Sequence, residues 1–231
     1  APMDVFWFRL PKTAHSGNDT MGIFEAGRLL VLINRHDYWQ TAYVFPKGTA
    51  DVVRARGLPL FRSEIARLAP EVADVVDSLT DWDQVKLLSV SLDRLERWHR
   101  PGLLAIGDAA HAMSPVGGVG INLAIQDAVA AANLLAAPLL DDDDIDAHLG
   151  LVQKRRMFPT RIVQRMQKAM HDNIIGSLFQ PDARLERPPF IARLVNGVSW
   201  LQRIPARLIG LGIRREHISP FIRKSGLSSA P

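Results

Sequence analysis

One segment restricts the fold of this chain more than any other, because it prescribes a strand, a glycine-rich loop and a long helix in succession. Residues 103–106 are all apolar and lead into Gly107-Asp108. A short apolar run that ends in turn residues is typical of a buried strand. After a loop with three further glycines, residues 121–137 are alanine-rich, which predicts a helix that Pro138 stops. The apolar stripe of this helix consists of Ile121, Ile125, Ala128, Ala132 and Leu135.

Residues 3–46 have the pattern of a β-sheet. Runs of β-branched and aromatic residues alternate there with Gly, Asn, Asp and Lys. Ala26-Gly27 fits a tight hairpin between two of the runs. From residue 58 the apolar spacing becomes helical, which predicts two short helices separated at Pro70, and residues 85–92 again have strand character. The strands expected in the sheet cover residues 5–10, 21–25, 29–34 and 38–45.

Charge divides the chain into two unequal parts. Residues 1–150 contain 13 Lys and Arg against 20 Asp and Glu, whereas residues 151–231 contain 15 against 4. We expect a helix over about 145–175, bent near Pro159, and short basic helices after residue 181. The cations are interspersed with apolar residues at helical spacing. This pattern favours a packed helix with an Arg-rich solvent face over a surface for nucleic acid or an anionic membrane.

Composition excludes several kinds of site. The chain has no cysteine, which removes disulfides, thiolate chemistry and cysteine-bound metal or iron–sulfur centres. Its seven histidines show no metal-ligand spacing. No unbroken apolar stretch reaches the roughly 18 residues of a membrane span. We therefore expect no metal and no membrane span, and a cytoplasmic location, which the lack of cysteine permits.

The glycine-rich loop has the residue types that hold a flat ligand with hydroxyl groups. Asp108 leaves a buried strand and is well placed to accept hydrogen bonds from hydroxyls. Glycines let the backbone approach a ring closely, and the N–H groups at a helix start can face negative charge. The glycines are Gly117, Gly118 and Gly120, and the helix opens at Ile121 and Asn122. Taken alone, Gly118-Val119-Gly120 fits tight packing equally well.

Taken together, the segment from Gly107 to Asn122 resembles the second FAD-binding motif of the flavoprotein aromatic hydroxylases, the p-hydroxybenzoate hydroxylase-like monooxygenases. It begins Gly-Asp-Ala-Ala-His and continues with a proline, three glycines, an asparagine and a helix containing Asp127-Ala128. His111 is expected to be a hydrogen-bonded structural residue without a catalytic role. No catalytic residue is assigned.

The resemblance implies roles for the loop residues. Asp108 would hold the ribityl chain of FAD, Gly107 would leave room for it, and Pro115 would lie beside the isoalloxazine ring. The turn into the helix would hold the flavin and stabilise its reduced form. The expected cofactor-binding residues are Gly107, Asp108, Pro115, Gly117, Gly118, Gly120, Ile121 and Asn122.

Residues 37–48 carry a second resemblance, to the substrate-domain strand that borders the flavin in the same family. Alternation along this strand places Gln40 on one face and Trp39 and Tyr43 on the other. These three residues are the candidates for the substrate side, with Gln40 first. In the alternative interpretation, Trp39 and Tyr43 belong to the core and Gln40 is merely exposed. Residues 205–218 also resemble the ending of bacterial members of the family.

Two N-terminal motifs of the family are missing from this sequence. Members of the family open with a strand–GxGxxG–helix unit for the FAD pyrophosphate, followed by a D-G motif associated with FAD and NAD(P)H. Neither pattern occurs in this sequence. We therefore expect the chain to be the C-terminal portion of such a flavoprotein. The strand over 103–106 would then lack the N-terminal strands that flank it in the family. A homodimer or swapped dimer would then cover that strand.

The resemblance implies an α/β family fold that is incomplete in this chain. We therefore expect an α+β chain in three parts. A substrate-domain β-sheet with helices covers 1–95, the C-terminal part of an FAD/NAD(P)-binding domain covers 96–180, and a helical tail covers 181–231. The implied function is FAD-dependent, NAD(P)H-using hydroxylation of an aromatic or related small molecule. Two alternatives stay open: a catalytically silent fragment with no FAD bound, and a basic module that binds nucleic acid or a membrane surface.

Overall fold

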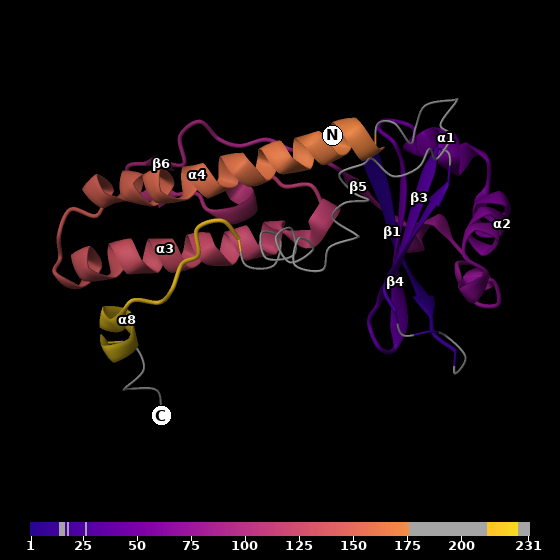
Figure 1. The fold of residues 1–231 in the computed structure, drawn as a ribbon, viewed down its shortest axis with the longest axis horizontal. Helices are drawn as coiled ribbons and strands as arrows, with labels where there is room; N and C mark the ends of the chain where they lie inside the picture. The colour runs from indigo at the N-terminus through magenta and orange to yellow at the C-terminus, as the bar shows by residue number, and fades with distance from the viewer. Residues whose placement is uncertain (14–16, 18, 26, 176–211, 226–231) are drawn as a thin grey trace, which may run out of the picture. The chain divides into compact units, whose positions relative to one another are not determined.

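The computed structural model describes residues 1–13, 17, 19–25, 27–175 and 212–225. It contains both helices and antiparallel sheets, so the expected α+β class is confirmed. The chain divides into two compact units, residues 1–90 with 169–188 and residues 91–168 with 189–231 (Figure 1). Most of the helical tail expected over 181–231 lies outside the described residues.

The first unit is built on a sheet of five antiparallel strands in the order β2-β3-β4-β1-β5 (Figure 1). Glu25 pairs with Arg28, and Gly27 has a φ of 79°, so the tight hairpin expected at this position is present. The strands are β1 (Met3–Pro11), β2 (Met21–Glu25), β3 (Arg28–Asn34), β4 (Tyr38–Pro46) and β5 (Lys86–Ser89).

Two helices, α1 (Ala50–Ala55) and α2 (Leu58–Leu68), pack on one face of this sheet. The ring of Phe61 on α2 lies 6.0 Å from that of Phe6 on β1 and 5.2 Å from that of Tyr43 on β4, between ring centroids. The second short helix expected after Pro70 is replaced by two 3-10 turns, Pro70–Val72 and Val76–Ser78. β-branched valines and local Asp and Ser side chains both disfavour a regular helix there.

Asp4 ties three parts of the first unit together. Its side chain is almost fully buried and accepts hydrogen bonds from Lys47 Nζ at 3.1 Å, from the Gly48 N–H at 2.9 Å and from the Val90 N–H at 3.2 Å. Burial alone would raise the pKa of Asp4, but these hydrogen bonds and the charge of Lys47 hold it below its usual value. The carboxylate thus joins β1 to the segments that follow β4 and β5.

The second unit contains a short hairpin and two long helices. Strand β6 (His99–Arg100) pairs antiparallel with β7 (Leu103–Leu104). The strand expected over 103–106 is therefore shorter than predicted, and Leu103 is 49% exposed. The helices are α3 (Gly120–Leu140), α4 (Asp146–Met170), of which residues 146–168 belong to this unit, and the short α8 (Pro220–Ser225). The π-helical turn His171–Ile175 follows α4 in the chain and is grouped with the first unit.

Helix α3 continues through Pro138, although the helix was expected to end there. Proline at this position removes only one backbone donor, and the last turn is closed by the Asp141 N–H bonding to the Ala137 carbonyl at 2.9 Å. The next helix begins at Asp146, whose N–H bonds to the Asp144 carboxylate at 3.1 Å. Asp144, the last of four consecutive aspartates at 141–144, thus caps α4 from outside the helix.

The apolar stripe expected on α3 lies largely at the surface. Ile121 is 69% exposed and Ile125 is 56% exposed, whereas the buried residues of α3 are Leu123, Asp127 and Ala130. By length and composition alone, residues 116–140 could cross a bilayer, because they contain an 18-residue window with a mean hydropathy of 1.6, of which 17% is buried. The expectation of no such span required an unbroken apolar run, and Asn122, Gln126 and Asp127 interrupt this one.

Asp4→Asn should lower the free energy of unfolding by about 1–3 kcal/mol, because it removes the charge-assisted bonds of a buried acceptor. Chemical denaturation at pH 7 measures the change, with Asp37→Asn, an exposed carboxylate of the same unit, as the control. Since the native pKa of Asp4 is lowered, its contribution is complete above pH 3.8 and disappears as the pH falls further. An unchanged unfolding free energy at pH 7 would contradict the anchoring role.

Candidate functional site

The loop between β7 and α3 begins with a close approach of backbone to helix. Gly107 has a φ of 57°, and a Cβ at this position would lie 2.9 Å from the Cβ of Ala124 on α3. A side chain is therefore excluded on both conformational and steric grounds. The 3-10 turn Gly107–Ala109 then presents Asp108 as an exposed residue.

The middle of the loop is open where a ligand could approach. Gly117 and Gly118 have φ values of 81° and 61°, and a Cβ on Gly118 would meet nothing within 4 Å. A Cβ on Gly120 would lie 3.4 Å from the Met113 Cβ and 4.0 Å from the Asp108 Oδ1. The fold thus brings the Asp108 carboxylate beside the first residue of α3.

The first turn of α3 adds a positive electrostatic end to the same place. Its N-cap residue, Val119, provides no side-chain cap, and the first turn holds no acidic residue. The partial positive charge of the helix start is therefore not neutralised by its own side chains. Ile121 is exposed at this end, while Asn122 is half-buried.

A buried carboxylate on α3 holds the loop from beneath. Asp127 Oδ2 accepts a hydrogen bond from the Gly107 N–H at 3.1 Å and lies 2.6 Å from His111 Nε2. Both side chains are fully buried. His111 Nδ1 has no partner among the described residues, and the ring packs 5.1 Å from that of Trp98. His111 is thus a buried residue hydrogen-bonded to Asp127, which is the structural role expected for it.

Arg156 of α4 completes this buried cluster. Its Nε donates to Asp127 Oδ1 at 2.8 Å, and its Nη1 donates to the Arg214 carbonyl at 3.0 Å. Glu216 lies 3.6 Å from Arg156 and binds the neighbouring Arg155 through two bonds of 2.8 and 2.7 Å. The cluster therefore joins the loop, α3, α4 and the segment after residue 212.

The partners of Asp127 lower its pKa. Its burial alone would raise the pKa, but hydrogen bonds from His111 and Arg156 outweigh burial and hold the pKa below its usual value. Asp127 is therefore a charged acceptor in the interior. A buried charge of this kind requires all its partners in place, which makes the loop position depend on α4.

Two glutamines of α4 hold the far half of the loop. Gln167 Nε2 donates to the carbonyls of Ser114 at 2.8 Å and Val116 at 2.9 Å, and its Oε1 accepts the Ser114 N–H at 3.1 Å. Gln164 Nε2 donates to the Ala112 carbonyl at 3.3 Å. Pro115, for which a place beside the flavin was expected, lies between the residues that Gln167 holds.

Sequence reasoning missed this role of α4. The basic residues of the helix were expected to form its solvent face, yet Arg156 is fully buried. The available signal was the helical spacing of polar residues on what became the buried face. These are Arg156, Thr160, Gln164 and Gln167.

The candidates for the substrate side lie in the first unit, on β4. Trp39 and Tyr43 are buried in the core under α2, as the second of the two interpretations had it. Tyr43 donates to Glu64 at 3.2 Å, and burial raises its pKa to about 12. Gln40 is half-buried on the opposite face and donates to the Phe8 carbonyl at 3.2 Å. Its place beside a substrate stays a prediction.

The loop residues fit a flavin nucleotide. An exposed carboxylate, an open double-glycine turn and an uncapped helix start lie together, and they suit a hydroxylated chain, a flat ring and negative charge on that ring. The candidate set is Gly107, Asp108, Pro115, Gly117, Gly118, Gly120, Ile121 and Asn122. Among the described residues, no group of His, Asp and Glu is arranged to hold a metal.

Comparison with known proteins shows the family to which the chain belongs. The family model of the FAD binding domain matches residues 3–166. The 6-methylpretetramide 4-monooxygenase of Streptomyces rimosus is 38% identical over 167 residues, which make up 71% of this chain and 39% of that protein. The kynurenine 3-monooxygenase of Stenotrophomonas maltophilia (strain K279a) is 32% identical over 138 residues, 58% of this chain and 29% of that protein.

A solved structure gives the same fold. PqsL, a probable FAD-dependent monooxygenase from Pseudomonas aeruginosa, matches with a TM-score of 0.61 at 23% identity, over 75% of this chain and 49% of that one. At this identity the likeness concerns the fold alone. The chain spans less than half the length of each of these three proteins.

Asp127→Asn should lower the free energy of unfolding by about 3–5 kcal/mol, because it leaves Arg156 buried without its closest charged partner. Asp141→Asn, which changes an exposed carboxylate at the end of the same helix, should stay within about 0.5 kcal/mol of the unmodified chain. Urea unfolding followed by circular dichroism measures both. Equal stability of the two variants would show that the buried cluster does not hold the unit together.

Proposed function

Because the chain belongs to the FAD binding domain family, we propose that its loop over residues 107–122 binds FAD in an enzyme that hydroxylates an aromatic or related small molecule. The observation that carries this proposal is the meeting of the Asp108 carboxylate, the open Gly117-Gly118 turn and the start of α3. The monooxygenases named above support the reaction class.

Each part of the loop has a binding task in this proposal. Asp108 accepts hydrogen bonds from the ribityl hydroxyls, and Gly107 lets the strand end lie against α3 without a side chain between them. Gly117 and Gly118 admit the ring edge. The N–H groups at Gly120 and Ile121, with the positive helix end, face the ring where negative charge collects on reduction.

FAD, when bound, supplies the redox chemistry of the reaction, and the residues of the chain orient it. The cluster of Asp127, His111 and Arg156 keeps the loop in place without touching the ring. Gln167 holds Ser114 and Val116 on either side of Pro115, so that Pro115 would be fixed in place beside a bound ring. The loop is thus fixed before the cofactor arrives, which lowers the entropic cost of binding.

The substrate side belongs to the sheet face opposite α1 and α2. Gln40 presents its amide there, next in register to Arg9 on β1 and Ile33 on β3. A half-buried amide between one arginine and one apolar side chain can offer a small aromatic compound both a polar and an apolar contact. Trp39 and Tyr43 act through the core, where they fix the strand that carries Gln40.

A dinucleotide-binding unit of the GxGxxG kind would complete this FAD site. The exposed apolar stripe of α3, with Ile121 and Ile125 at its N-terminal end, is the face that such a unit or a second copy of the chain would cover. Use of NAD(P)H, dimer formation and a cytoplasmic location stay predictions.

The nucleic-acid alternative loses support from the ion pairs. Arg155 and Arg156 of the basic part are committed to Glu216 and Asp127 within the structure. The silent-fragment alternative is decided by the flavin titration that follows.

Asp108→Ala should weaken FAD binding about tenfold, because the ribityl hydroxyls lose a charged acceptor. Quenching of flavin fluorescence during titration of the chain measures the dissociation constant. Asp141→Ala, at the far end of α3, removes the same charge and should bind FAD like the unmodified chain. Equal affinity in both variants would contradict the proposed site, and no FAD binding by the unmodified chain would favour the silent fragment.

A further inference from the structure

The exposed face of α4 carries acidic, apolar and basic side chains in that order along the chain. Between residues 147 and 168, the exposed positions recur every three or four residues and therefore form one stripe on the helix. We call this stripe, together with the aspartates at 141–144 that precede the helix, the outer face of α4. The residues of the stripe are Ala147, Leu151, Lys154, Phe158, Arg161, Arg165 and Lys168.

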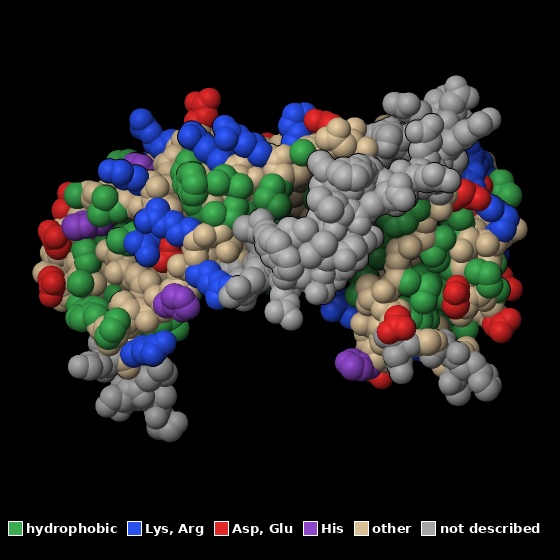
Figure 2. Space-filling view, in the orientation of Figure 1, with side chains coloured by type: hydrophobic (Ala, Val, Ile, Leu, Met, Phe, Trp, Pro, Cys, Tyr) green, Lys and Arg blue, Asp and Glu red, His purple; other side chains and the backbone are tan. Residues whose placement is uncertain are grey.

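The outer face is acidic where α3 is joined to α4. The four consecutive aspartates at 141–144 are all exposed. Asp143 lies 3.1 Å from His148 Nε2, and Asp144 accepts a hydrogen bond from the Asp146 N–H at 3.1 Å. Figure 2 shows acidic side chains gathered at this end of the unit, and Lys and Arg side chains along α4. With one histidine beside four carboxylates, this end has a surplus of negative charge.

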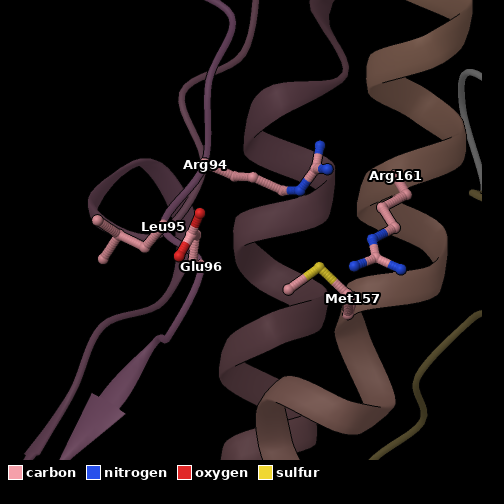
Figure 3. A pocket seen from close by; sticks show the side chains of 5 residues that line it. All are labelled: Arg94, Leu95, Glu96, Met157 and Arg161. Atoms are coloured by element: carbon pink, nitrogen blue, oxygen red, sulfur yellow. The ribbon is translucent and has the colours of Figure 1, made fainter.

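The outer face is basic toward its other end. Arg161 projects from α4 over a hollow that Arg94 and Glu96 also line (Figure 3). A neighbouring hollow is lined by Arg94 and Arg161 again, and by Arg165 and Lys168. Glu96 supplies one negative charge among these side chains, against the positive charges of three arginines and a lysine. This end therefore has a surplus of positive charge.

The middle of the outer face is apolar. Phe158 is 57% exposed and Leu151 is 44% exposed, and the two lie about two helical turns apart on the stripe. Lys154 lies between them, and the stem of a lysine can cover apolar surface while its ammonium group stays in water. An exposed apolar patch with charged residues around it is typical of an interaction surface.

The order of these side chains makes the outer face complementary to itself. When a second copy lies antiparallel on the first, with Leu151 opposite the partner's Phe158, the two-fold axis passes between positions 154 and 155. The same axis places Asp144 opposite the partner's Arg165, about 16 Å from the axis along the helix. In a parallel arrangement, each charged end would instead meet its own charge. Antiparallel pairing is therefore the arrangement that the charges favour.

We propose that the outer face of α4 is the docking surface for a second copy of this chain, which binds antiparallel so that each acidic end meets a basic end. The buried face of α4 holds the loop over 107–122 through Gln164 and Gln167, so docking involves neither that loop nor the exposed stripe of α3. The proposal does not depend on FAD. Because one helix face buries a small area, we expect a weak dimer that forms with rising concentration.

Sedimentation velocity of the full chain at low salt, over a range of concentrations, tests the apolar centre of this surface. We expect a reversible dimer whose dissociation constant rises about tenfold in Phe158→Ser, which removes the central contact. Ile125→Ser, the matched control, changes a 56% exposed side chain on α3 and should leave the dimer unchanged. A chain that stays monomeric up to about 1 mM would overturn the proposal. A dimer that Phe158→Ser does not weaken would overturn it too, and weakening by Ile125→Ser alone would assign the contact to α3.

Charge reversal tests the pairing of the two ends. Asp141→Lys/Asp142→Asn/Asp143→Lys makes the acidic end positive, with asparagine at the position whose φ is 54°, and Arg161→Glu/Arg165→Glu makes the basic end negative. Each variant alone should dimerise about tenfold more weakly, because its two ends carry the same charge. An equimolar mixture should form a heterodimer about tenfold tighter than either homodimer, and high salt should reduce this difference.

A heterodimer no tighter than the two homodimers would overturn the proposal. Circular dichroism shows whether each variant keeps the fold, which is expected because the changed side chains are exposed. If either variant unfolds, the single changes Asp141→Lys and Arg165→Glu take their place, and the same comparison of mixture with single variants decides. None of these changes touches the loop over 107–122, so the dimer and the flavin titration are tested independently.

Discussion

The buried ion pair between Asp127 and Arg156 is the interaction on which the second unit depends. It lies 2.8 Å across, is fully buried, and has bonds to His111, to the Gly107 backbone and to the Arg214 carbonyl. A buried charge pair adds little stability over a well-packed apolar core, but it is strongly destabilising when one partner is lost. Its value here is positional, because it allows only one arrangement of loop and helices.

The sequence allowed most of the sheet and the loop to be predicted. Alternating β-branched and aromatic runs placed β1 to β4, and Gly107, Gly117 and Gly118 all have the positive φ values for which glycine is required. These features are local, so a pattern read along the chain contains them. Recognition of the whole ordered segment, rather than of any one glycine, indicated the flavin family.

What sequence could not give were the contacts between distant segments. The α3 stripe was expected to be its buried face, but the partners of Asp127 turned another face inward. In the sequence, Arg156 cannot be distinguished from the other cations of the helix. Its partner Asp127 is 29 positions away along the chain, so the pair is recognised only in the folded structure. The same holds for Gln164 and Gln167, whose amides find carbonyls more than 50 residues away. The spacing of residues along a helix identifies one of its faces, but it does not identify the segment that packs against that face.

The buried face of helix α4 holds the loop through Gln164 and Gln167. Hydrogen–deuterium exchange of the chain with and without FAD shows whether the loop over residues 107–122 binds FAD. We expect slower exchange of the backbone N–H groups from Gly117 to Asn122 when FAD is present. Unchanged exchange there, with protection confined to other segments, would contradict it.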